Sequence, residues 1–280
     1  MILVRRIQEL KKIIKRVKQR NRTVGLVPTM GALHEGHLSL IRTARRETDF
    51  VVASIFVNPL QFGPQEDYKK YPRRLKKDLI LAESAGANLV FAPTARELYS
   101  SNLKINLDIP SLSNRLCGLK RPGHFQGVLT VVNKLFNLVE PDIAYFGQKD
   151  YQQARLIKTM AGLLNMNLKI KISPIIRAPD GLALSSRNQY LSSSQRQNAV
   201  CLYRALSHAR NLIKNGEKYS SEIIKKIRFM INSAKGTRID YIAITNPLTL
   251  TEITKINRRP VLVALAVYVG RTRLIDNILI

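Results

Sequence analysis

The sequence predicts an α/β fold, with a doubly wound parallel sheet in an N-terminal domain, residues 1–176, and a smaller α+β domain, residues 177–280. Three observations lead to this prediction. Over the first 176 residues, short apolar runs rich in β-branched residues alternate with stretches of helical hydrophobic spacing. One run, FVVASIFV at residues 50–57, is apolar throughout, as expected of a parallel strand buried on both faces. After Ile176 the pattern changes to a loop rich in Gly, Ser and Asp or Asn, then two helical stretches and alternating strands.

The first predicted element is an amphipathic helix over residues 2 to about 20. Its apolar residues recur at spacings of three and four, with Lys and Arg between them: Leu3, Ile7, Leu10, Ile14 and Val17. A basic amphipathic helix is also typical of transit peptides and membrane-surface segments. We favour a helix packed on the domain, because an apolar strand follows within a few residues, at residues 23–27.

The later elements continue the alternation of helices and strands. Helices are predicted at residues 38–48, 73–85, 128–139 and from about 151, and strands at residues 50–57, 88–93, 143–146 and 168–176. In the smaller domain, helices are predicted at residues 194–215 and 221–232, and strands at residues 238–245 and 261–269. Ligands of doubly wound sheets bind at the carboxyl ends of the strands, so the loops that begin at Pro28 and Asn58 should both face a ligand.

Composition narrows the class of protein. No apolar run approaches the roughly 20 residues that span a bilayer. Basic residues interrupt the apolar pattern of the N-terminus, so we expect neither a membrane span nor a secretory signal. The two cysteines, Cys117 and Cys201, form no metal-ligand spacing and no disulfide framework, which makes a reducing cytoplasm the expected compartment.

The formal net charge is 46 − 19 = +27. Clustered Lys and Arg neutralise nucleic-acid phosphates, so an RNA-binding protein is one interpretation. The basic residues are instead spread along the chain, and aromatic residues make up only 6%, which leaves no evident platform for stacked bases. We therefore favour a drift of surface composition toward Lys and Arg, and expect no nucleic-acid partner.

The segment PTMGALHEGHLSLI, residues 28–41, leaves an apolar strand through a glycine-containing turn and enters a helix. A helix N-terminus offers unpaired N–H groups and partial positive charge, both of which favour an anion such as phosphate. His34 and His37, three residues apart on one helix face, could both reach that anion and stabilise charge on a transferring phosphoryl group. Structural histidines are an equal alternative, and a zinc site with His124 as third ligand is a weaker one.

Two further segments offer groups suited to phosphate and one to a neutral ligand. Ser185, Ser186 and Arg187 lie on a glycine-containing loop that could clamp phosphate, although serine-rich turns are often only solvated. Lys149 could meet phosphate as a point charge, and the adjacent Asp150 could bind a ribose hydroxyl or Mg²⁺ or could simply cap a helix. The amides of Asn58, Gln61 and Gln153 suit a polyol or carboxylate.

Five segments, in this order and spacing, resemble the pantothenate synthetase (pantoate–β-alanine ligase) family over nearly the full length. They are PTMGALHEGHLSLI, SIFVNPLQFGPQEDYKKYPR, RPGHFQGVLTVVNKLFNLVEPDIAYFGQKDYQQ, DGLALSSRNQYL and TRLIDN. The resemblance implies a Rossmann-like fold of the nucleotidyltransferase type and an ATP-dependent ligase. In that reaction pantoate first forms pantoyl adenylate with release of diphosphate. The amine of β-alanine then attacks the acyl carbon and releases AMP and pantothenate, the precursor of coenzyme A.

The resemblance also implies the roles of individual residues. By motif match, the ATP site is expected to be formed by Met30, Gly31, His34, Gly36, His37, Gly147, Gln148, Lys149, Asp150, Ile176, Leu184, Ser185, Ser186 and Arg187. Catalytic roles fall to His34, His37 and Lys149, with His37 usually assigned as the acid. Gln61 and Gln153 are expected to bind pantoate, with Gln61 also near β-alanine. Mg²⁺ accompanies the nucleotide, through ligands that the sequence does not identify. The family further suggests a homodimer and a C-terminal domain that acts as a lid.

Three features depart from the family pattern. Many relatives carry Glu at the position of Gln148, a Glu is usual at the position of Cys117, and a net charge of +27 is unusual. Two alternatives remain open at this point: another adenylyltransferase with the same histidine motif, and a basic RNA-binding module on a synthetase-like core. A phosphorylated substrate would call for more cations near Gln61 and Gln153, which favours the ligase.

Overall fold

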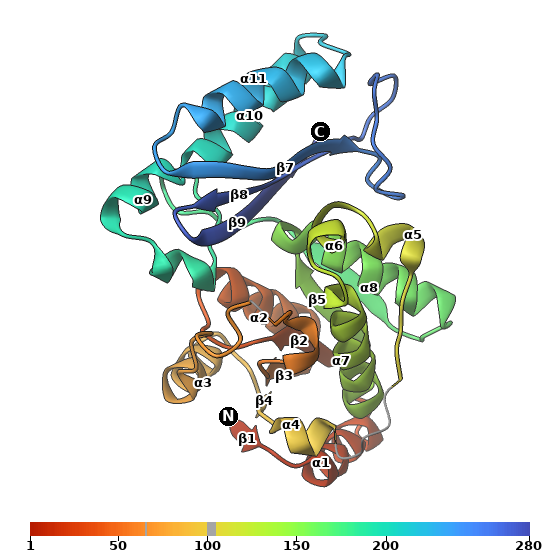
Figure 1. Ribbon diagram of the computed structural model, residues 1–280. Helices are drawn as coiled ribbons and strands as arrows, with labels where there is room; N and C mark the ends of the chain where they lie inside the picture. The colour runs from red at the N-terminus through yellow and green to blue at the C-terminus, as the bar shows by residue number, and fades with distance from the viewer. Residues whose placement is uncertain (65, 100–104) are drawn as a thin grey trace.

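The computed structural model describes residues 1–64, 66–99 and 105–280. Its elements form two parts, one above the other in Figure 1: a parallel six-stranded sheet with its helices, and an antiparallel three-stranded sheet with its own. The predicted α/β fold class, with a doubly wound sheet followed by a smaller α+β part, is confirmed. The domain boundary at residue 176 stays a prediction.

The first sheet has the strand order β1-β4-β3-β2-β5-β6, with every pair parallel. Its strands are β1 (Ile2–Val4), β2 (Val24–Thr29), β3 (Phe50–Ile55), β4 (Leu89–Phe91), β5 (Ile143–Gly147) and β6 (Lys169–Ser173). Successive strands from β2 to β4 are added on one side, and β5 and β6 are added on the other. The point where this order reverses lies between β2 and β5, and ligands of such sheets bind at that point, beyond the carboxyl ends of the strands.

Helices cover both faces of this sheet. One face packs against α1 (Ile7–Gln19), α7 (His124–Val139) and α8 (Tyr151–Leu163), and the other against α2 (Glu35–Glu47) and α3 (Leu75–Ser84). Short helices lie in the connections: α4 (Ala95–Leu98), α5 (Pro110–Ser113), α6 (Leu116–Lys120), and the 3₁₀ turns η1 (Pro59–Gln61) and η2 (Gln148–Asp150). Because both faces are covered, β3 carries no polar residue except Ser54, as its continuous apolar run predicted.

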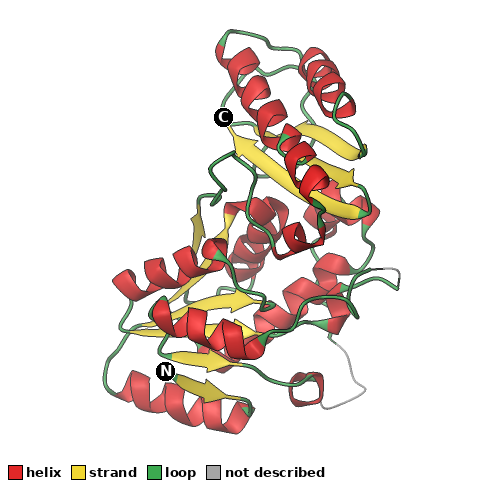
Figure 2. Ribbon diagram, turned by 90° about the vertical axis from the view of Figure 1, so that its left-hand side faces the viewer, coloured by secondary structure: helices red, strands yellow, loops and turns green. Residues whose placement is uncertain are grey.

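The second sheet is formed by β7 (Thr237–Thr245), β8 (Leu262–Val269) and β9 (Thr272–Leu279). The elements before and beside it are η3 (Ser186–Tyr190), α9 (Ser193–Asn198), α10 (Cys201–Lys214) and α11 (Ser220–Asn232). Figures 1 and 2 show α10 and α11 on its outer face. Alternate residues of β8 divide between two cores: Val263 and Leu265 pack with these helices, whereas Leu262 and Ala264 join the core of the first part. The central strand is therefore buried on both faces.

Two local predictions were wrong in detail, and one strand was not predicted. Residues 2–4 do not belong to the N-terminal helix but pair with β4 as an edge strand, and the helix begins at Ile7, whose N–H donates to the Glu97 carboxylate. The helix predicted at residues 194–215 is divided near Val200, where tighter bonds of the 3₁₀ type replace the α-helical ones. The C-terminal segment, for which no element was predicted, forms β9. No helix in the described part of the chain has the length and apolarity needed to cross a bilayer.

Candidate active site

The turn after β2 brings its two histidines together at the start of α2. His34 is the N-cap residue, and its Nδ1 accepts a hydrogen bond from the Gly36 N–H at 3.1 Å. The Nδ1 of His37 in turn faces the N–H of His34 at 3.4 Å, so the two side chains form a reciprocal capping box. The ring centroids lie 4.1 Å apart. Both Nδ1 atoms act as acceptors, so the proton of each neutral ring sits on Nε2.

Both imidazoles are held in the neutral form. Burial, and then the positive charge of Lys149, lowers the pKa of His34 to about 4. Burial also lowers the pKa of His37 well below its ordinary value, with further contributions from His34 and Lys149. At neutral pH each ring therefore offers an Nε2–H hydrogen-bond donor without a formal charge.

The buried carboxylate of Asp78 anchors this turn through two backbone hydrogen bonds. Asp78, on α3, accepts hydrogen bonds from the N–H groups of Ala32 at 2.9 Å and Leu33 at 2.8 Å, and is only 2% exposed. Gly31 adopts φ +83°, and a Cβ there would meet the Asp78 carboxylate and Ile55 at 3.0 Å. Glycine is therefore required at position 31 both for its backbone conformation and for the close approach of Asp78. Asp78 did not appear among the predicted site residues.

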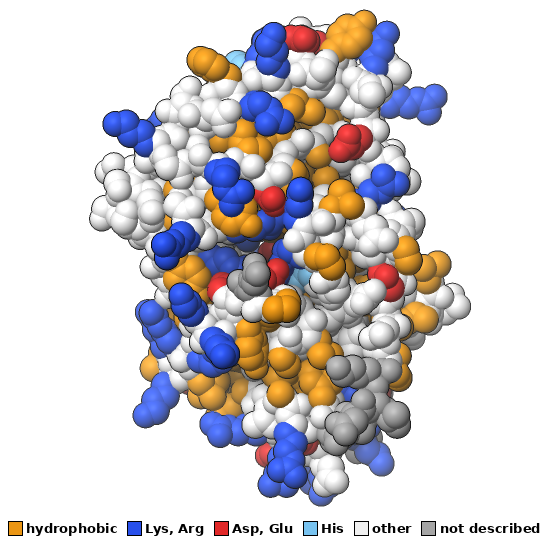
Figure 3. All heavy atoms as spheres, viewed as in Figure 1, with side chains coloured by type: hydrophobic (Ala, Val, Ile, Leu, Met, Phe, Trp, Pro, Cys, Tyr) orange, Lys and Arg blue, Asp and Glu red, His pale blue; other side chains and the backbone are white. Residues whose placement is uncertain are grey.

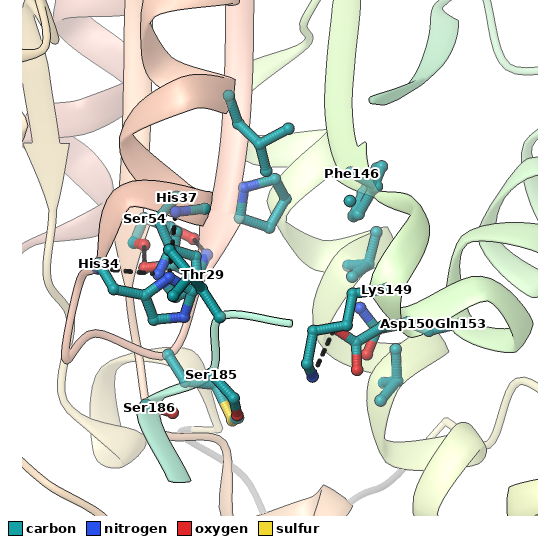
Figure 4. Close-up of a pocket in the computed structure, with 18 of the residues that line it drawn as sticks. Thr29, His34, His37, Ser54, Phe146, Lys149, Asp150, Gln153, Ser185 and Ser186 are labelled. Atoms are coloured by element: carbon teal, nitrogen blue, oxygen red, sulfur yellow. Dashed lines mark hydrogen bonds and ion pairs between the residues drawn. The ribbon is translucent and has the colours of Figure 1, made fainter. Parts of the chain in front are cut away.

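The turn after β5 presents Lys149 and Asp150 across the cavity from the histidines, as Figure 4 shows. Their charged groups lie 3.8 Å apart. Asn277 of β9 donates to the backbone carbonyls of Gln148, at 3.0 Å, and Lys149, at 2.9 Å. The side chain of Gln148 turns toward Asn277 and does not line the cavity.

The loop that carries Ser185 to Arg187 is held by residues from the first part. The Arg187 guanidinium donates to both oxygens of Asp67, at 2.9 and 2.7 Å, and the hydroxyls of Ser186 and Tyr71 are 3.0 Å apart. Burial alone would lower the pKa of Arg187, but the hydrogen bond and charge of Asp67 outweigh it and raise the pKa. The loop thus closes one side of the cavity through two cross-links.

Gln61 also lines the cavity, and neighbouring side chains orient its amide. Its Oε1 accepts from Asn58 Nδ2 at 3.2 Å, and Asn58 is fixed by the Gly127 carbonyl at 3.0 Å and the Tyr99 hydroxyl at 2.9 Å. Because its oxygen is engaged in this way, the Nε2 amino group of Gln61 faces the cavity, near the Met30 sulfur at 3.0 Å. This wall offers a hydrogen-bond donor to a carboxylate or hydroxyl.

A series of side-chain hydrogen bonds ends at the backbone carbonyl of Gln61. Glu66 accepts from Arg121 at 2.6 Å, Arg121 donates to His124 Nε2 at 2.9 Å, and His124 Nδ1 donates to the Gln61 carbonyl at 2.7 Å. Burial, followed by the charge of Arg121, lowers the pKa of His124 to about 3. His124 therefore stays neutral and belongs to this series of hydrogen bonds, apart from the histidine pair. Within the described residues no group of three or more His, Cys, Asp and Glu could hold a metal ion.

These residues enclose a cavity of about 190 Å³ between the carboxyl ends of β2 and β5. Of the residues predicted to form the site, all but Gly31 and Gln148 line it. The apolar lining was not predicted, and it includes Phe56, Val128, Val131, Val132, Leu135 and Phe146. A larger cleft of about 1090 Å³ continues from it and shares Lys149, Asp150, Ser185 and Arg187. Figure 3 shows a hollow between the two parts where basic, acidic and histidine side chains meet.

Comparison with known proteins agrees with this geometry. The family model described as pantoate-beta-alanine ligase matches residues 2–279. The chain belongs to this family of ligases. The pantothenate synthetases of Caldicellulosiruptor saccharolyticus and Acetivibrio thermocellus are 50% and 51% identical to it, over 100% of this chain and 99% of theirs. The resemblance predicted from the five sequence segments is confirmed.

Solved structures of the family have the same fold. Pantothenate synthetase from Thermus thermophilus superposes with a TM-score of 0.94 at 43% identity and covers 99% of each chain. Pantoate-beta-alanine ligase from Francisella tularensis, determined with beta-gamma ATP and beta-alanine, superposes with a TM-score of 0.81 at 36% identity, over 100% of this chain and 97% of that one. The chain is therefore a full-length match to pantoate–β-alanine ligases, and neither alternative function gains support.

The structure also answers how a pantoate–β-alanine ligase accommodates Cys117. Its sulfur lies 3.3 Å from the Tyr241 hydroxyl and 3.6 Å from the Arg273 guanidinium, at the contact between the two parts. Arg273 is paired with Asp240 at 2.8 Å. The positive charge of Arg273 is thus balanced within the second sheet, beside the neutral contacts of Cys117.

Four residues that support the cavity were not predicted as site residues, and they share one property. Asp67, Tyr71, Asp78 and Asn277 contact the site through partners at least 45 residues away in the chain. None lies in a local pattern that separates it from a surface residue. The only available signal was that Asp67, Tyr71 and Asn277 fall inside segments that resemble the ligase family.

Proposed function

We propose that this chain condenses pantoate with β-alanine, using ATP, in two steps at the cavity between β2 and β5. A pantoate carboxylate oxygen attacks the α-phosphorus of ATP, and diphosphate leaves. The amine of β-alanine then attacks the acyl carbon of the mixed anhydride, loses a proton, and AMP leaves. The observation that carries the proposal is the convergence of the histidine turn, the Lys149 turn and the Ser185–Arg187 loop on one cavity with an apolar, amide-bearing wall. The relative from Francisella tularensis, solved with beta-gamma ATP and beta-alanine, supports it.

The nucleotide half of the cavity suits an in-line displacement at phosphorus. His34 and His37 offer neutral Nε2–H donors beside the N-terminus of α2, where anions are favoured. Lys149 and Arg187 supply positive charge from the other sides. Because His37 is neutral and deeply buried, we propose that it stabilises the developing charge by hydrogen bonding and transfers no proton.

The other half suits a small, partly apolar hydroxy acid. Gln61 presents its amino group to the cavity, Gln153 also lines the cavity, and much of the remaining lining is apolar. Pantoate carries two hydroxyls, a carboxylate and a pair of methyl groups on one carbon, which match these contacts. A substrate with a phosphate would place two negative charges against neutral amides, which is unfavourable. We propose that β-alanine enters next to Gln61, from the larger cleft.

The carboxylate of Asp150 suits a Mg²⁺ ion bound to the nucleotide. Mg²⁺ prefers one or two carboxylates together with substrate phosphates and water, and rarely requires a cage formed by protein alone. Asp150 is half-exposed beside Lys149 and lines both the cavity and the larger cleft. We propose that Asp150 helps to hold Mg²⁺, which when bound would offset charge on the nucleotide phosphates.

Three further properties belong to the proposal. We propose that residues 177–280 act as a lid domain, since the Ser185–Arg187 loop reaches the cavity from that side. We also propose a homodimer through the N-terminal domain, from the family resemblance, and a cytoplasmic location, from the two cysteines that form no disulfide framework. Light scattering of the purified chain tests the dimer directly, and a monomer at micromolar concentration would contradict it.

A coupled assay of AMP release tests the reaction itself. With ATP, Mg²⁺ and pantoate but no β-alanine, we expect adenylate formation, seen as diphosphate exchange into ATP, without sustained AMP release. Adding β-alanine should start continuous turnover. Turnover that did not depend on both acids would refute the proposal. Tight, salt-sensitive RNA binding without such turnover would support the RNA-binding alternative.

A further inference from the structure

The segment TRLIDN near the C-terminus ends in two buried polar residues on β9. Asp276 is 2% exposed and Asn277 is 4% exposed. A polar side chain on a buried strand is destabilising unless it is fully hydrogen-bonded. Asp276 accepts one hydrogen bond from the Asn277 N–H, and the other side-chain partners of both residues lie outside the second sheet, in the segments that carry Lys149 and Ser185 to Arg187.

Asn277 uses its whole amide on the turn that carries Lys149. Its Nδ2 donates to the carbonyls of Gln148 and Lys149, at 3.0 and 2.9 Å, and its Oδ1 accepts from Gln148 Nε2 at 3.3 Å. Two donors on two consecutive carbonyls fix the orientation of the short η2 turn. The Lys149 side chain leaves from this fixed backbone toward the cavity.

Asp276 anchors the loop that carries Ser185 to Arg187. Its two oxygens accept from the Arg177 guanidinium at 2.6 and 2.9 Å, and Arg177 also donates to the Gly181 carbonyl at 3.0 Å. Gly181 has φ +94°, and a Cβ there would lie 1.9 Å from the Tyr203 ring, so only glycine fits at this position of the loop. These contacts fix the base of the loop whose far end carries Ser185 to Arg187.

We propose that Asp276 and Asn277 are positioning residues that hold the Lys149 turn and the Ser185–Arg187 loop in register with each other for ATP. Successive residues of a strand point to opposite faces, so one strand end can reach both segments. The inference rests on the proposed function, because it assigns both segments to the nucleotide. It also gives the second sheet a direct part in the site.

The test is a double-mutant cycle between Asn277 and Lys149, read by ATP–diphosphate exchange. We expect Asn277→Ala to reduce kcat/KM for ATP by about 10-fold, the scale of a slightly misplaced charged group, with the KM for pantoate unchanged. In a Lys149→Ala background the same substitution should cost less than about twofold, since Asn277 acts through Lys149. Asp276→Asn, which breaks the Arg177 pair, should also lower kcat/KM for ATP selectively.

Asn246→Ala is the matched control. The Asn246 side chain accepts from the N–H groups of Leu248 and Thr249 in a turn that lines neither cavity, so its loss should lower thermal stability without changing the KM for ATP. If Asn277→Ala does not fold, Asn277→Ser retains one donor and serves instead. Equal losses in both backgrounds, or a loss of stability alone, would overturn the inference. An unaffected Lys149→Ala enzyme would instead overturn the proposed role of Lys149 in the reaction.

Discussion

Two segments that line the cavity, the histidine turn at residues 30–37 and the serine–arginine loop at residues 184–187, are held in different ways. The histidine turn is capped by its own side chains, within three residues, and is anchored by one buried carboxylate, Asp78. The serine–arginine loop has its main cross-links to Asp67 and Tyr71, 120 and 115 residues away in the chain. One is formed largely by local geometry, and the other depends on the meeting of two distant loops.

This difference predicts different behaviour during binding. Breaking hydrogen bonds between backbone N–H groups and a buried carboxylate is energetically costly, so the histidine turn should already be formed before ATP binds. The Asp67–Arg187 pair is bidentate, but it is about a quarter exposed on each side and joins two loops through side-chain contacts. The serine–arginine loop should therefore be the part that adjusts when ATP enters. The two segments should therefore respond differently to substitution and to pH.

The largest effect is expected at the histidine turn. His37→Ala should reduce adenylate formation by about 10²-fold or more, because it removes a preorganised donor to the transferring phosphoryl group. Single-turnover adenylate formation measures this effect. His208→Ala, on α10 and outside both cavities, is the control and should be neutral. A near-normal His37→Ala enzyme would show that the pair only caps α2.

Removing the anchor of the same turn comes next. Asp78→Ala leaves two backbone N–H groups without their buried acceptor, which should lower the free energy of unfolding by about 1–3 kcal/mol. Because the turn would also lose its fixed shape, the KM for ATP should rise. Urea unfolding and steady-state kinetics measure the two effects. Unchanged stability would mean that the turn does not depend on Asp78.

A smaller effect is expected for the serine–arginine loop. Asp67→Asn should raise the KM for ATP by about three- to tenfold, because Arg187 then has to be ordered when the nucleotide binds. Stability should change little. Arg196→Gln is a matched control, since it breaks the bidentate Arg196–Asp180 pair away from the cavities. A lower KM in Asp67→Asn would instead mean that Asp67 competes with phosphate for Arg187.

The smallest effect concerns pH. The pKa of His34 falls from 6.5 to about 4 on folding, so between these pH values the unfolded chain binds more protons than the folded chain. The free energy of unfolding should therefore decrease as the pH falls from 6.5 toward 4. His34→Asn preserves an N-cap acceptor and removes this titration, so its stability should fall less steeply over the same range. Urea unfolding at pH 7 and pH 5 measures the difference, and equal slopes would argue against a neutral, buried His34.

The sequence predicted much of the first part of the fold for identifiable reasons. The strand at β3 was expected because burial on two faces leaves a continuous apolar run, and the helix at α3 because burial on one face leaves a helical spacing of apolar residues. The edge strand of the sheet and the junction between two helices could not be predicted in this way. The strand at residues 2–4 shares its apolar residues with a helical spacing, and only its pairing with β4 decides between the two structures. The same applies to the split between α9 and α10.

For the site, the sequence identified the residues that lie on turns with a distinctive local composition. The histidine turn, Lys149 with Asp150, and the loop from Leu184 to Arg187 all line the cavity as expected. Gly31 and Gln148 lie behind it: Gly31 permits the turn, and Gln148 contacts Asn277. The roles proposed for all these residues in substrate binding stay predictions.

The alternation of strands and helices and the strand–turn–helix layout of the histidine segment could be predicted from residues near one another in the chain, and membership of the ligase family from the order and spacing of five segments. Only the tertiary structure decided that Asp78 holds that turn, that Asp67 and Tyr71 hold the serine–arginine loop, and that Asn277 holds the Lys149 turn. A polar residue on a loop or strand looks the same in the sequence whether it faces water or a partner. Its partner is fixed by how distant segments meet when the two cores are buried, and a local pattern does not record that meeting.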